Sequence, residues 1–250
     1  MMFENTVVRG IVLDTSLIKE YDKRLLILTV ELGRITVFAN GARRKNSSLT
    51  AVSQKFVMGS FTIRPSGRES YALISAEIEE SFLDLSYDIE KMAYASYFCE
   101  LAGHYTREGI GATDELNLLY VTFKKILSDR FSLKFIKSVF ECKLLDIEGM
   151  GLQMYECVKT QTDKDLHHIS LEDGGLVTDA VLSSTKSPIY ISDGAIYMIR
   201  YILSCSIDRV YSFEIKQEIA DEVALLMDKY ISLNADRHFK SLDILVDIME

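Results

Sequence analysis

The sequence has few cysteines and lacks the short motifs that identify common enzyme classes. Its four cysteines, Cys99, Cys142, Cys157 and Cys205, form no C-x-x-C pair, which argues against a disulfide scaffold and against a zinc knuckle. No G-x-x-x-x-G-K-[ST], G-x-G-x-x-G or G-x-S-x-G sequence occurs, so no apparatus for nucleotide hydrolysis or acyl transfer is visible. We therefore expect a protein that is not an enzyme.

A secretion signal and a membrane span are also missing from the sequence. The first residues, MMFENTVVRG, contain neither a basic start nor an apolar run. The most apolar later stretch, residues 195–207, is interrupted by Arg200. We expect a cytoplasmic protein without membrane contact, whose 250 residues can bury a core in one domain or two.

The net charge of −9 argues at first against a nucleic-acid partner, because phosphate binding needs local positive potential. The charge is unevenly distributed, however. Residues 1–80 hold 11 Lys and Arg against 9 Asp and Glu, a net charge of +2, which leaves −11 for residues 81–250. This asymmetry indicates two parts with different surfaces.

The first part of the chain has the pattern of β-strands joined by turns. Leu32-Gly33 and Pro65-Ser66-Gly67 supply turn residues between apolar runs. Five runs have strand-like composition or alternation, at residues 6–13, 25–30, 35–39, 57–64 and 71–78. A five-stranded barrel of this size fits an OB-fold, although the strand count also admits other small barrels.

From Asp84 onward the apolar residues recur with a helical period. Helices are expected over residues 89–101, from an N-cap at Asp114 to residue 127, and over 132–147, 194–204 and 212–233. Residues 149–190 lose this period and are rich in Gly, Thr, Ser and Asp. The predicted fold is thus α+β and multidomain: an OB-fold β-barrel in residues 1–80, then an all-α helical domain in residues 81–250 with an irregular insert at about 149–190.

A segment without acidic residues carries the chemistry. Between Glu31 and Glu69 there is no Asp or Glu, while seven cations occur: Arg34, Arg43, Arg44, Lys45, Lys55, Arg64 and Arg68. Residues 40–48 predict a mobile loop whose cations and hydroxyls follow a phosphate backbone, with a solvated basic loop as the alternative. An exposed subset of the interleaved aromatics Phe38, Phe56, Phe61 and Tyr71 would stack on unpaired bases, while the rest would fill the core.

Several segments of the sequence resemble the RecO family of bacterial recombination mediators. They are G-I-V-L at residues 10–13, Asp22-Lys23-Arg24-Leu25, E-L-G-R-I-T at 31–36, N-G-A-R-R-K at 40–45, Met92-Ala93-Tyr94-Ala95-Ser96-Tyr97, and Arg237-His238-Phe239-Lys240-Ser241-Leu242. Their order and spacing cover residues 1–147 and 190–245.

The resemblance implies a cytoplasmic, nucleoid-associated protein of the RecF pathway of DNA repair. Such a protein binds single- and double-stranded DNA, anneals complementary strands, and helps load recombinase onto DNA coated with single-strand-binding protein, in partnership with RecR. The resemblance assigns DNA contact to Arg34, Arg43, Arg44 and Lys45. DNA contact by Lys55, Arg64 and Arg68 is inferred from the acid-free segment alone.

The sequence departs from the family at a zinc site. Many RecO proteins have four cysteines there, in a C-x-x-C and after a G-G-L; this chain keeps Cys157 and Gly174-Gly175-Leu176, but has Thr160, Thr178 and Val181 at the other three positions. One thiolate cannot hold a structural zinc ion, and the nearby Asp163, Asp165, His167 and His168 show no second ligand pair with metal spacing. We expect no cofactor.

The resemblance also implies that the helical part binds the acidic, apolar tail of single-strand-binding protein. Phe131 and Phe135 lie among five cations that would form a rim: Lys124, Lys125, Arg130, Lys134 and Lys137. The alternative is a solvated face over core aromatics.

Two other functions stay open at this stage. One is an interaction module that binds proteins only, and the other is a metal-dependent hydrolase that uses His167 and His168. The sequence leaves undecided the preference for single or double strands, the oligomeric state, the RecR-binding surface and any residual metal near Cys157.

Overall fold

The computed structural model describes residues 4–67 and 69–243, which fold into two compact units. Of the described residues, those up to Phe123 together with 239–243 form one unit, and residues 124–238 form the other. The first contains the barrel, and it also takes in the helices that follow directly. Within the described ranges, no helix has the length and apolar character needed to cross a membrane.

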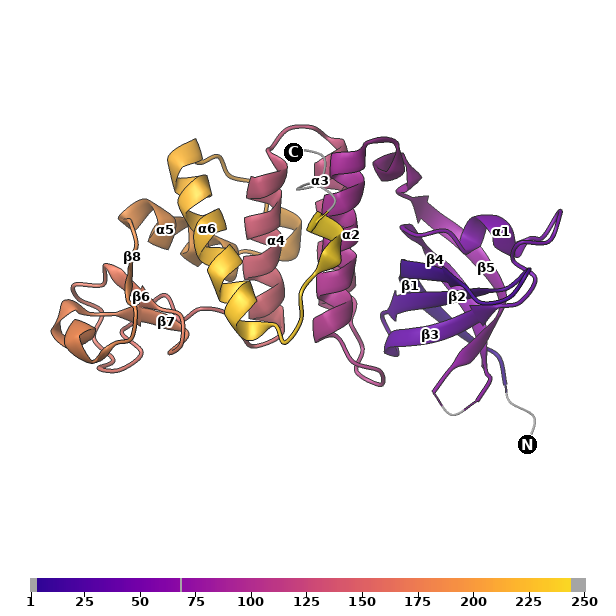
Figure 1. Cartoon of the computed structure of the whole chain (residues 1–250), viewed down its shortest axis with the longest axis horizontal. Helices are drawn as coiled ribbons and strands as arrows, with labels where there is room; N and C mark the ends of the chain where they lie inside the picture. The colour runs from indigo at the N-terminus through magenta and orange to yellow at the C-terminus, as the bar shows by residue number, and fades with distance from the viewer. Residues whose placement is uncertain (1–3, 68, 244–250) are drawn as a thin grey trace. The chain divides into compact units, whose positions relative to one another are not determined.

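Five strands of the first unit form a closed barrel in the order β1-β2-β3-β5-β4 (Figure 1). The strands are β1 (Thr6–Leu17), β2 (Lys23–Thr29), β3 (Gly33–Ala39), β4 (Val57–Pro65) and β5 (Tyr71–Ser81). Only the β3–β5 pair is parallel. Each predicted run became a strand, and this strand order with five strands confirms the predicted OB-fold barrel.

Alternation along the strands fills the barrel interior. Ile35, Val37 and Ala39 of β3 are fully buried, while the side chains between them face outward. The neighbouring strands add further buried residues to this core, including Val8, Val12, Leu25, Ile27, Phe61, Ile63 and Leu73. Burial of each large apolar side chain contributes about 1.5–3 kcal/mol, so this core is a major favourable contribution to the stability of the barrel.

The turn between β2 and β3 needs glycine for two reasons. Gly33 has a φ of +66°, a conformation that residues with a Cβ atom rarely adopt. A Cβ at this position would also lie 2.1 Å from the carbonyl oxygen of Arg107. The loop before α3 therefore packs directly on this turn, where Gly109 N donates to Leu32 O at 2.9 Å.

Helices cover the barrel within the first unit. α1 (Leu49–Val52) and the short helix Leu83–Tyr87 precede α2 (Ile89–Tyr105), whose N-cap is Asp88, and α3 (Thr113–Leu127) follows. Asp114, the expected N-cap of α3, lies inside its first turn. Edge-to-face contacts of Phe123 with Phe56 and Phe82 hold α3.

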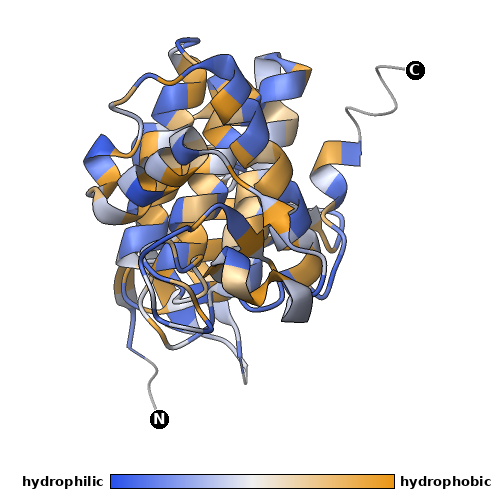
Figure 2. Ribbon diagram, turned by 90° about the vertical axis from the view of Figure 1, so that its left-hand side faces the viewer, coloured by the Kyte–Doolittle hydropathy of each residue, from blue (hydrophilic) through white to orange (hydrophobic). Residues whose placement is uncertain are grey.

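The second unit is mainly helical. α4 (Leu133–Ile147), α5 (Asp193–Ser204) and α6 (Gln217–Asn234) pack on one another, and hydrophobic and hydrophilic stretches alternate along their ribbons (Figure 2). Ser132 caps α4, because its Oγ accepts the N–H of Phe135 at 3.3 Å. α6 begins at Gln217, five residues later than residue 212, where helical periodicity was expected to start.

The insert is more regular than expected. β6 (His168–Ser170), β7 (Gly175–Val177) and β8 (Ile189–Tyr190) form a three-stranded antiparallel sheet, and the short helix Asp179–Ser184 lies between β7 and β8 in the chain. Strands of two or three residues are too short for alternation to be recognised in a sequence. The description of residues 149–190 as irregular was therefore wrong for this small sheet.

Candidate nucleic-acid interface

The loop that follows β3, residues 40–48, contains most of the predicted cations and is called the basic loop below. Three hydrogen bonds tie it to the turn between β1 and β2. Gly41 N donates to Asp22 Oδ1 at 2.7 Å, Arg43 N donates to Tyr21 O at 3.0 Å, and the Arg43 guanidinium donates to Glu20 O at 2.9 Å. The first half of the loop is therefore held in place, although the sequence predicted a mobile loop.

The cations of the basic loop are available to a ligand. Arg43, Arg44 and Lys45 are all exposed, and no ion pair joins them to a carboxylate among residues 4–67 and 69–243. The Arg44 guanidinium lies 5.8 Å from the ring centroid of Tyr21, within cation–π distance. Three adjacent positive charges that no described carboxylate pairs with give the loop a positive potential.

The structure does not bring all seven predicted cations together. The Arg34 guanidinium donates to the carbonyl oxygen of Gly103 in α2, and Lys55 Nζ bonds to Ser96 Oγ of the same helix at 2.9 Å. Arg64 is exposed on the outer face of β4, and Arg68 lies outside the described residues. Arg34 and Lys55 thus attach α2 to the barrel. The contiguous exposed cations are those of the basic loop.

Sequence reasoning missed cations beside the basic loop. The Lys19 side chain is 79% exposed in the β1–β2 turn. Arg24 is exposed on β2, directly opposite the half-buried Phe38 of β3. The intervening Lys23 is instead committed to the interior: its Nζ donates to Ser53 O at 3.1 Å, and burial, followed by the charge of Arg43, lowers its pKa.

The predicted aromatics divide between the core and the surface. Phe56 and Phe61 are buried, so neither stacks on a ligand. Phe38 and Tyr71 are half-buried on the outside of the barrel. Burial, and then the carboxylate of Glu108 that accepts its hydroxyl, raise the pKa of Tyr71, which ties this ring to the protein. Phe38 is therefore the predicted aromatic best placed to meet a base.

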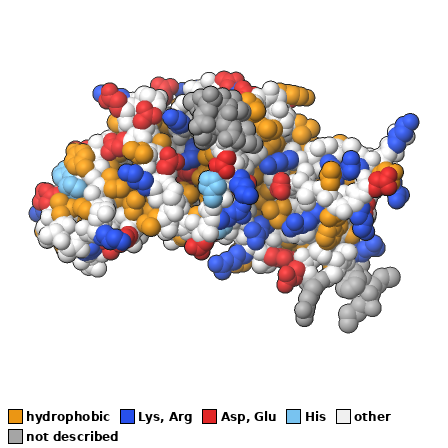
Figure 3. Space-filling view, viewed as in Figure 1, with side chains coloured by type: hydrophobic (Ala, Val, Ile, Leu, Met, Phe, Trp, Pro, Cys, Tyr) orange, Lys and Arg blue, Asp and Glu red, His pale blue; other side chains and the backbone are white. Residues whose placement is uncertain are grey.

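The charge on the visible face agrees with this placement. Lys and Arg side chains predominate over Asp and Glu on the barrel, which lies on the right of Figure 3. Where acids do occur, some are already paired: Arg9 Nε lies 2.8 Å from Glu79 Oε2. That guanidinium is the leading reason why the pKa of Glu79 lies below its usual value. The face of the barrel seen in Figure 3 is therefore mainly basic although the chain is acidic.

The residues at the family's zinc position do not fit a zinc ion. Cys157 is fully buried, and its thiol accepts hydrogen bonds from the Thr160 hydroxyl and from the N–H groups of Lys159, Thr160 and Thr178. Burial raises the pKa of this thiol, but the hydrogen bonds outweigh burial, so the pKa lies below its usual value. Thr178 and Val181 bring no thiolate, and zinc requires four N, S or O ligands.

The two histidines of the insert have separate partners. His167 Nδ1 lies 3.8 Å from Asp193 Oδ1, and His168 Nδ1 lies 3.2 Å from Asp179 Oδ1. In the part of the chain that the structure describes, no group of three or more His, Cys, Asp or Glu side chains has a metal-binding arrangement. The described residues therefore offer no set of metal ligands that would support the hydrolase hypothesis.

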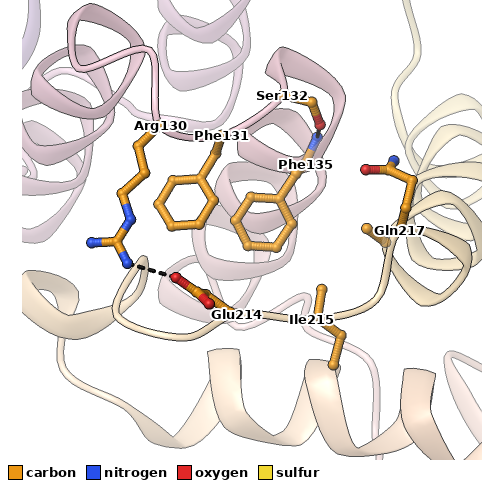
Figure 4. A pocket seen from close by; sticks show the side chains of 8 residues that line it. Arg130, Phe131, Ser132, Phe135, Glu214, Ile215 and Gln217 are labelled. Atoms are coloured by element: carbon orange, nitrogen blue, oxygen red, sulfur yellow. Dashed lines mark hydrogen bonds and ion pairs between the residues drawn. The ribbon is translucent and has the colours of Figure 1, made fainter.

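The second unit contains a pocket of about 290 Å³ at the start of α4 (Figure 4). Its lining comprises Arg130, Phe131, Ser132, Phe135, Glu214, Ile215, Gln217 and Ala220. The rings of Phe131 and Phe135 stack at a centroid distance of 5.1 Å and an angle of 29°. Arg130 bridges to Glu214 at 2.8 Å across the rim, so an apolar floor and a charged edge meet in one place.

The five cations predicted around these aromatics have different roles. Arg130 lines the pocket, Lys125 Nζ lies 5.5 Å from the Phe131 ring centroid, and Lys124 and Lys134 are exposed. Lys137 is buried, with its Nζ 2.7 Å from Glu141 Oε1 and 2.5 Å from Asp228 Oδ1. Lys137 therefore joins α4 to α6 and is not part of an exposed rim.

Comparison with known proteins agrees with both units. The family model "Recombination protein O N terminal" matches residues 2–82, and "Recombination protein O C terminal" matches residues 86–243. The chain is similar to the "DNA repair protein RecO" of Clostridium kluyveri, with 28% identity covering 96% of this chain and 93% of that one. It is also similar to the proteins of that name from Clostridium perfringens (30% identity; 96% and 97%) and Alkaliphilus metalliredigens (29%; 94% and 96%). With matches that extend over nearly all of its length, the chain belongs to the recombination protein O family.

Proposed function

We propose that this protein is a DNA repair and recombination mediator that binds single- and double-stranded DNA and anneals complementary strands. The observation that carries the proposal is the basic loop, in which Arg43, Arg44 and Lys45 are exposed and form no ion pair with any described carboxylate. Arg64 is a further exposed cation, on β4, and we propose DNA contact for it as well as for Arg68, which lies outside the described residues. Contacts with phosphates give affinity without sequence preference, as a general repair factor requires.

Annealing by such a surface needs no covalent step. The cations reduce the repulsion between two phosphate backbones, and base pairing supplies the free energy. We therefore propose a protein that is not an enzyme and that works in the cytoplasm, on nucleoid DNA. In the RecF pathway it would act with RecR to help load recombinase onto DNA coated with single-strand-binding protein.

An annealing assay with two complementary oligonucleotides tests this function. We expect the protein to accelerate annealing, and we expect DNA affinity to fall steeply as salt rises, because phosphate contacts release counterions. Failure to bind any oligonucleotide at low salt would contradict the proposal. It would favour the alternative of an OB-fold and helical module that binds proteins only, for which the pocket in the second unit is the supporting feature.

We further propose that this pocket holds the C-terminal tail of single-strand-binding protein. An apolar tail residue fits the stacked Phe131 and Phe135, and the acidic residues of the tail fit the cationic rim. Arg130 lies 5.3 Å from the Phe131 ring centroid and forms a surface ion pair with Glu214, and such an exposed pair costs little to break. Lys134 is exposed in the first turn of α4, beside the pocket residue Ser132 in the sequence.

A tail peptide should bind the protein in a salt-sensitive manner, and Arg130→Glu with Lys134→Glu should weaken it about tenfold or more because both substitutions repel the acidic residues. Fluorescence anisotropy of a labelled peptide measures this. Lys164→Glu with Lys229→Glu changes the net charge equally at exposed positions away from the pocket and serves as the control. The assignment would be contradicted if both variants lost peptide affinity equally. It would also be contradicted if the pocket variant lost DNA binding as well as peptide binding.

We infer that the insert folds without a metal ion. The Thr160 side chain and the backbone of Thr178 lie at the buried Cys157 thiol, where the resemblance to RecO implies a four-cysteine site in many family members. Val158 N also donates to Leu176 O at 2.9 Å, which fixes the turn at residues 157–160 on β7. Stoichiometric zinc in the purified protein, measured by elemental analysis, would contradict this inference.

A further inference from the structure

The turn between β1 and β2 exposes apolar side chains that the barrel does not use. Leu17, Ile18 and Tyr21 are 62%, 45% and 42% exposed. Single exposed apolar residues are common on protein surfaces. Three within five residues of one turn, which Ile18 N closes by donating to Asp22 O at 3.3 Å, form a small apolar patch. These three residues are called the turn patch.

The turn patch is held in a fixed position. The turn that carries the patch accepts two hydrogen bonds from Arg43, at Glu20 O and Tyr21 O. Asp22 in the same turn accepts a third from Gly41 N. The Glu20 carboxylate near the Tyr21 hydroxyl is the main reason why the pKa of Tyr21 lies above its usual value. An arrangement fixed before binding loses less conformational entropy when a ligand arrives.

Cations surround the turn patch. Lys19 is in the same turn, with its Nζ 4.0 Å from Asp22 Oδ2, and the Arg44 guanidinium of the basic loop lies 5.8 Å from the Tyr21 ring centroid. A few residues along β2, exposed Arg24 faces Phe38 across the strand pair and repeats the combination of a cation with an aromatic ring. Rings alternating with cations are the pattern by which proteins hold unpaired nucleotides, with bases on the rings and phosphates on the cations.

The charge and the apolar surface together identify the ligand class. A DNA duplex presents phosphates but hides the faces of its bases, so it would use the cations and leave the turn patch exposed. A single strand presents both. We propose that the turn patch contacts the bases of single-stranded nucleic acid, with Tyr21 as the stacking ring, while the basic loop holds the adjacent phosphates. This inference rests on the proposed DNA-binding function.

Such a contact also has a consequence for annealing. Stacking on the turn patch would hold one face of a base and leave its pairing edge accessible to a complementary strand. The patch would then contribute to single-strand affinity without adding charge. Its contribution is therefore separable from that of the basic loop by salt dependence, because only charged contacts release counterions.

Binding of a labelled oligothymidylate and of a labelled duplex to the full chain tests the proposal. Tyr21→Ala should weaken single-strand binding about tenfold, since one stacked base is worth roughly that much. Leu17→Ser with Ile18→Ser should weaken it further. Duplex affinity should change by less than about twofold, and the salt dependence of both should stay the same.

Two controls make the result specific. Tyr21→Phe keeps the ring and loses only the hydroxyl near Glu20, so it should bind nearly as well as the unchanged protein. Val7→Ser and Tyr197→Ala, at positions that are 61% and 67% exposed outside the patch, should have no effect. Tyr21→Ala alters an exposed side chain, so a melting curve should show an unchanged folded state.

Three outcomes would overturn the proposal, and each is distinct. Unchanged single-strand binding in the Tyr21→Ala variant would show that the patch meets no base. Equal weakening for the single strand and the duplex would show a general effect on the basic loop. Intact DNA binding with loss of RecR binding would identify a protein-docking surface. Failure of the unchanged protein to bind DNA would instead remove the proposed function itself.

Discussion

Reversal of the three charges of the basic loop, by Arg43→Glu, Arg44→Glu and Lys45→Glu, should weaken single-strand binding by about 100-fold at about 0.1 M salt. Each phosphate contact with a single strand raises the logarithm of the affinity by about 0.7 for every tenfold dilution of salt. Between about 1 M and about 0.1 M salt, three contacts therefore contribute about two orders of magnitude in affinity, which the variant loses. Annealing should fail with binding. Fluorescence anisotropy and an annealing assay measure the two effects.

The matched control places the same charge change elsewhere. Lys164→Glu, Arg209→Glu and Lys229→Glu reverse three exposed cations of the second unit and alter the net charge equally. This variant should bind DNA nearly as well as the unchanged protein. Both variants should melt like the unchanged protein, because exposed charges contribute little to stability. Equal DNA affinity of the two variants would contradict the assignment of DNA contact to the basic loop.

Lys137→Met should lower the free energy of unfolding by about 3–5 kcal/mol. Lys137 is buried between α4 and α6, and its partner Glu141 has no exposed surface. The substitution would leave a buried carboxylate without its ammonium. Burial lowers the pKa of Lys137, but Glu141 and Asp228 outweigh burial and raise it, so the lysine is charged at neutral pH. Urea denaturation at neutral pH measures the effect.

A second substitution separates the charge effect from the packing effect. Lys137→Met with Glu141→Leu removes both buried charges and should recover most of the lost stability, because apolar replacement of a buried pair is often neutral. Lys134→Met on the exposed side of the same helix should change stability by less than about 0.5 kcal/mol. A Lys137→Met protein as stable as the Lys134→Met protein would show that the pair does not hold the two helices together.

The barrel could be predicted from the sequence because its signals are local. Alternation in Ile35, Val37 and Ala39 and the turn at Leu32-Gly33 specify a strand and its start without knowledge of the partners. The small sheet at 168–190 could not be predicted in this way, since its strands have two or three residues and depend on one another for pairing. The start of α6 was also misplaced, because apolar spacing continues upstream of Gln217 although the helix does not.

The cations of the candidate site could be located in the sequence, but their partners in the fold could not. The acid-free segment predicted one group of cations, of which the structure leaves Arg43, Arg44 and Lys45 together and exposed, but a linear run of charge does not show which cations a neighbouring helix engages. Arg34 and Lys55 bond to α2, which is distant in sequence. Lys19 and Arg24 were overlooked because Glu20 and Asp22 lie between them. In the fold, Asp22 accepts the Gly41 N–H and Glu20 lies near the Tyr21 hydroxyl.

The central claim is that the cations of the basic loop neutralise phosphates, and the salt dependence of single-strand affinity tests it most directly. The slope of the logarithm of affinity against the logarithm of salt should be smaller by about 2 in the Arg43→Glu, Arg44→Glu, Lys45→Glu variant, because about three contacts are lost. The control variant with reversals in the second unit should keep the full slope. Equal slopes in the unchanged protein and the loop variant would contradict the claim.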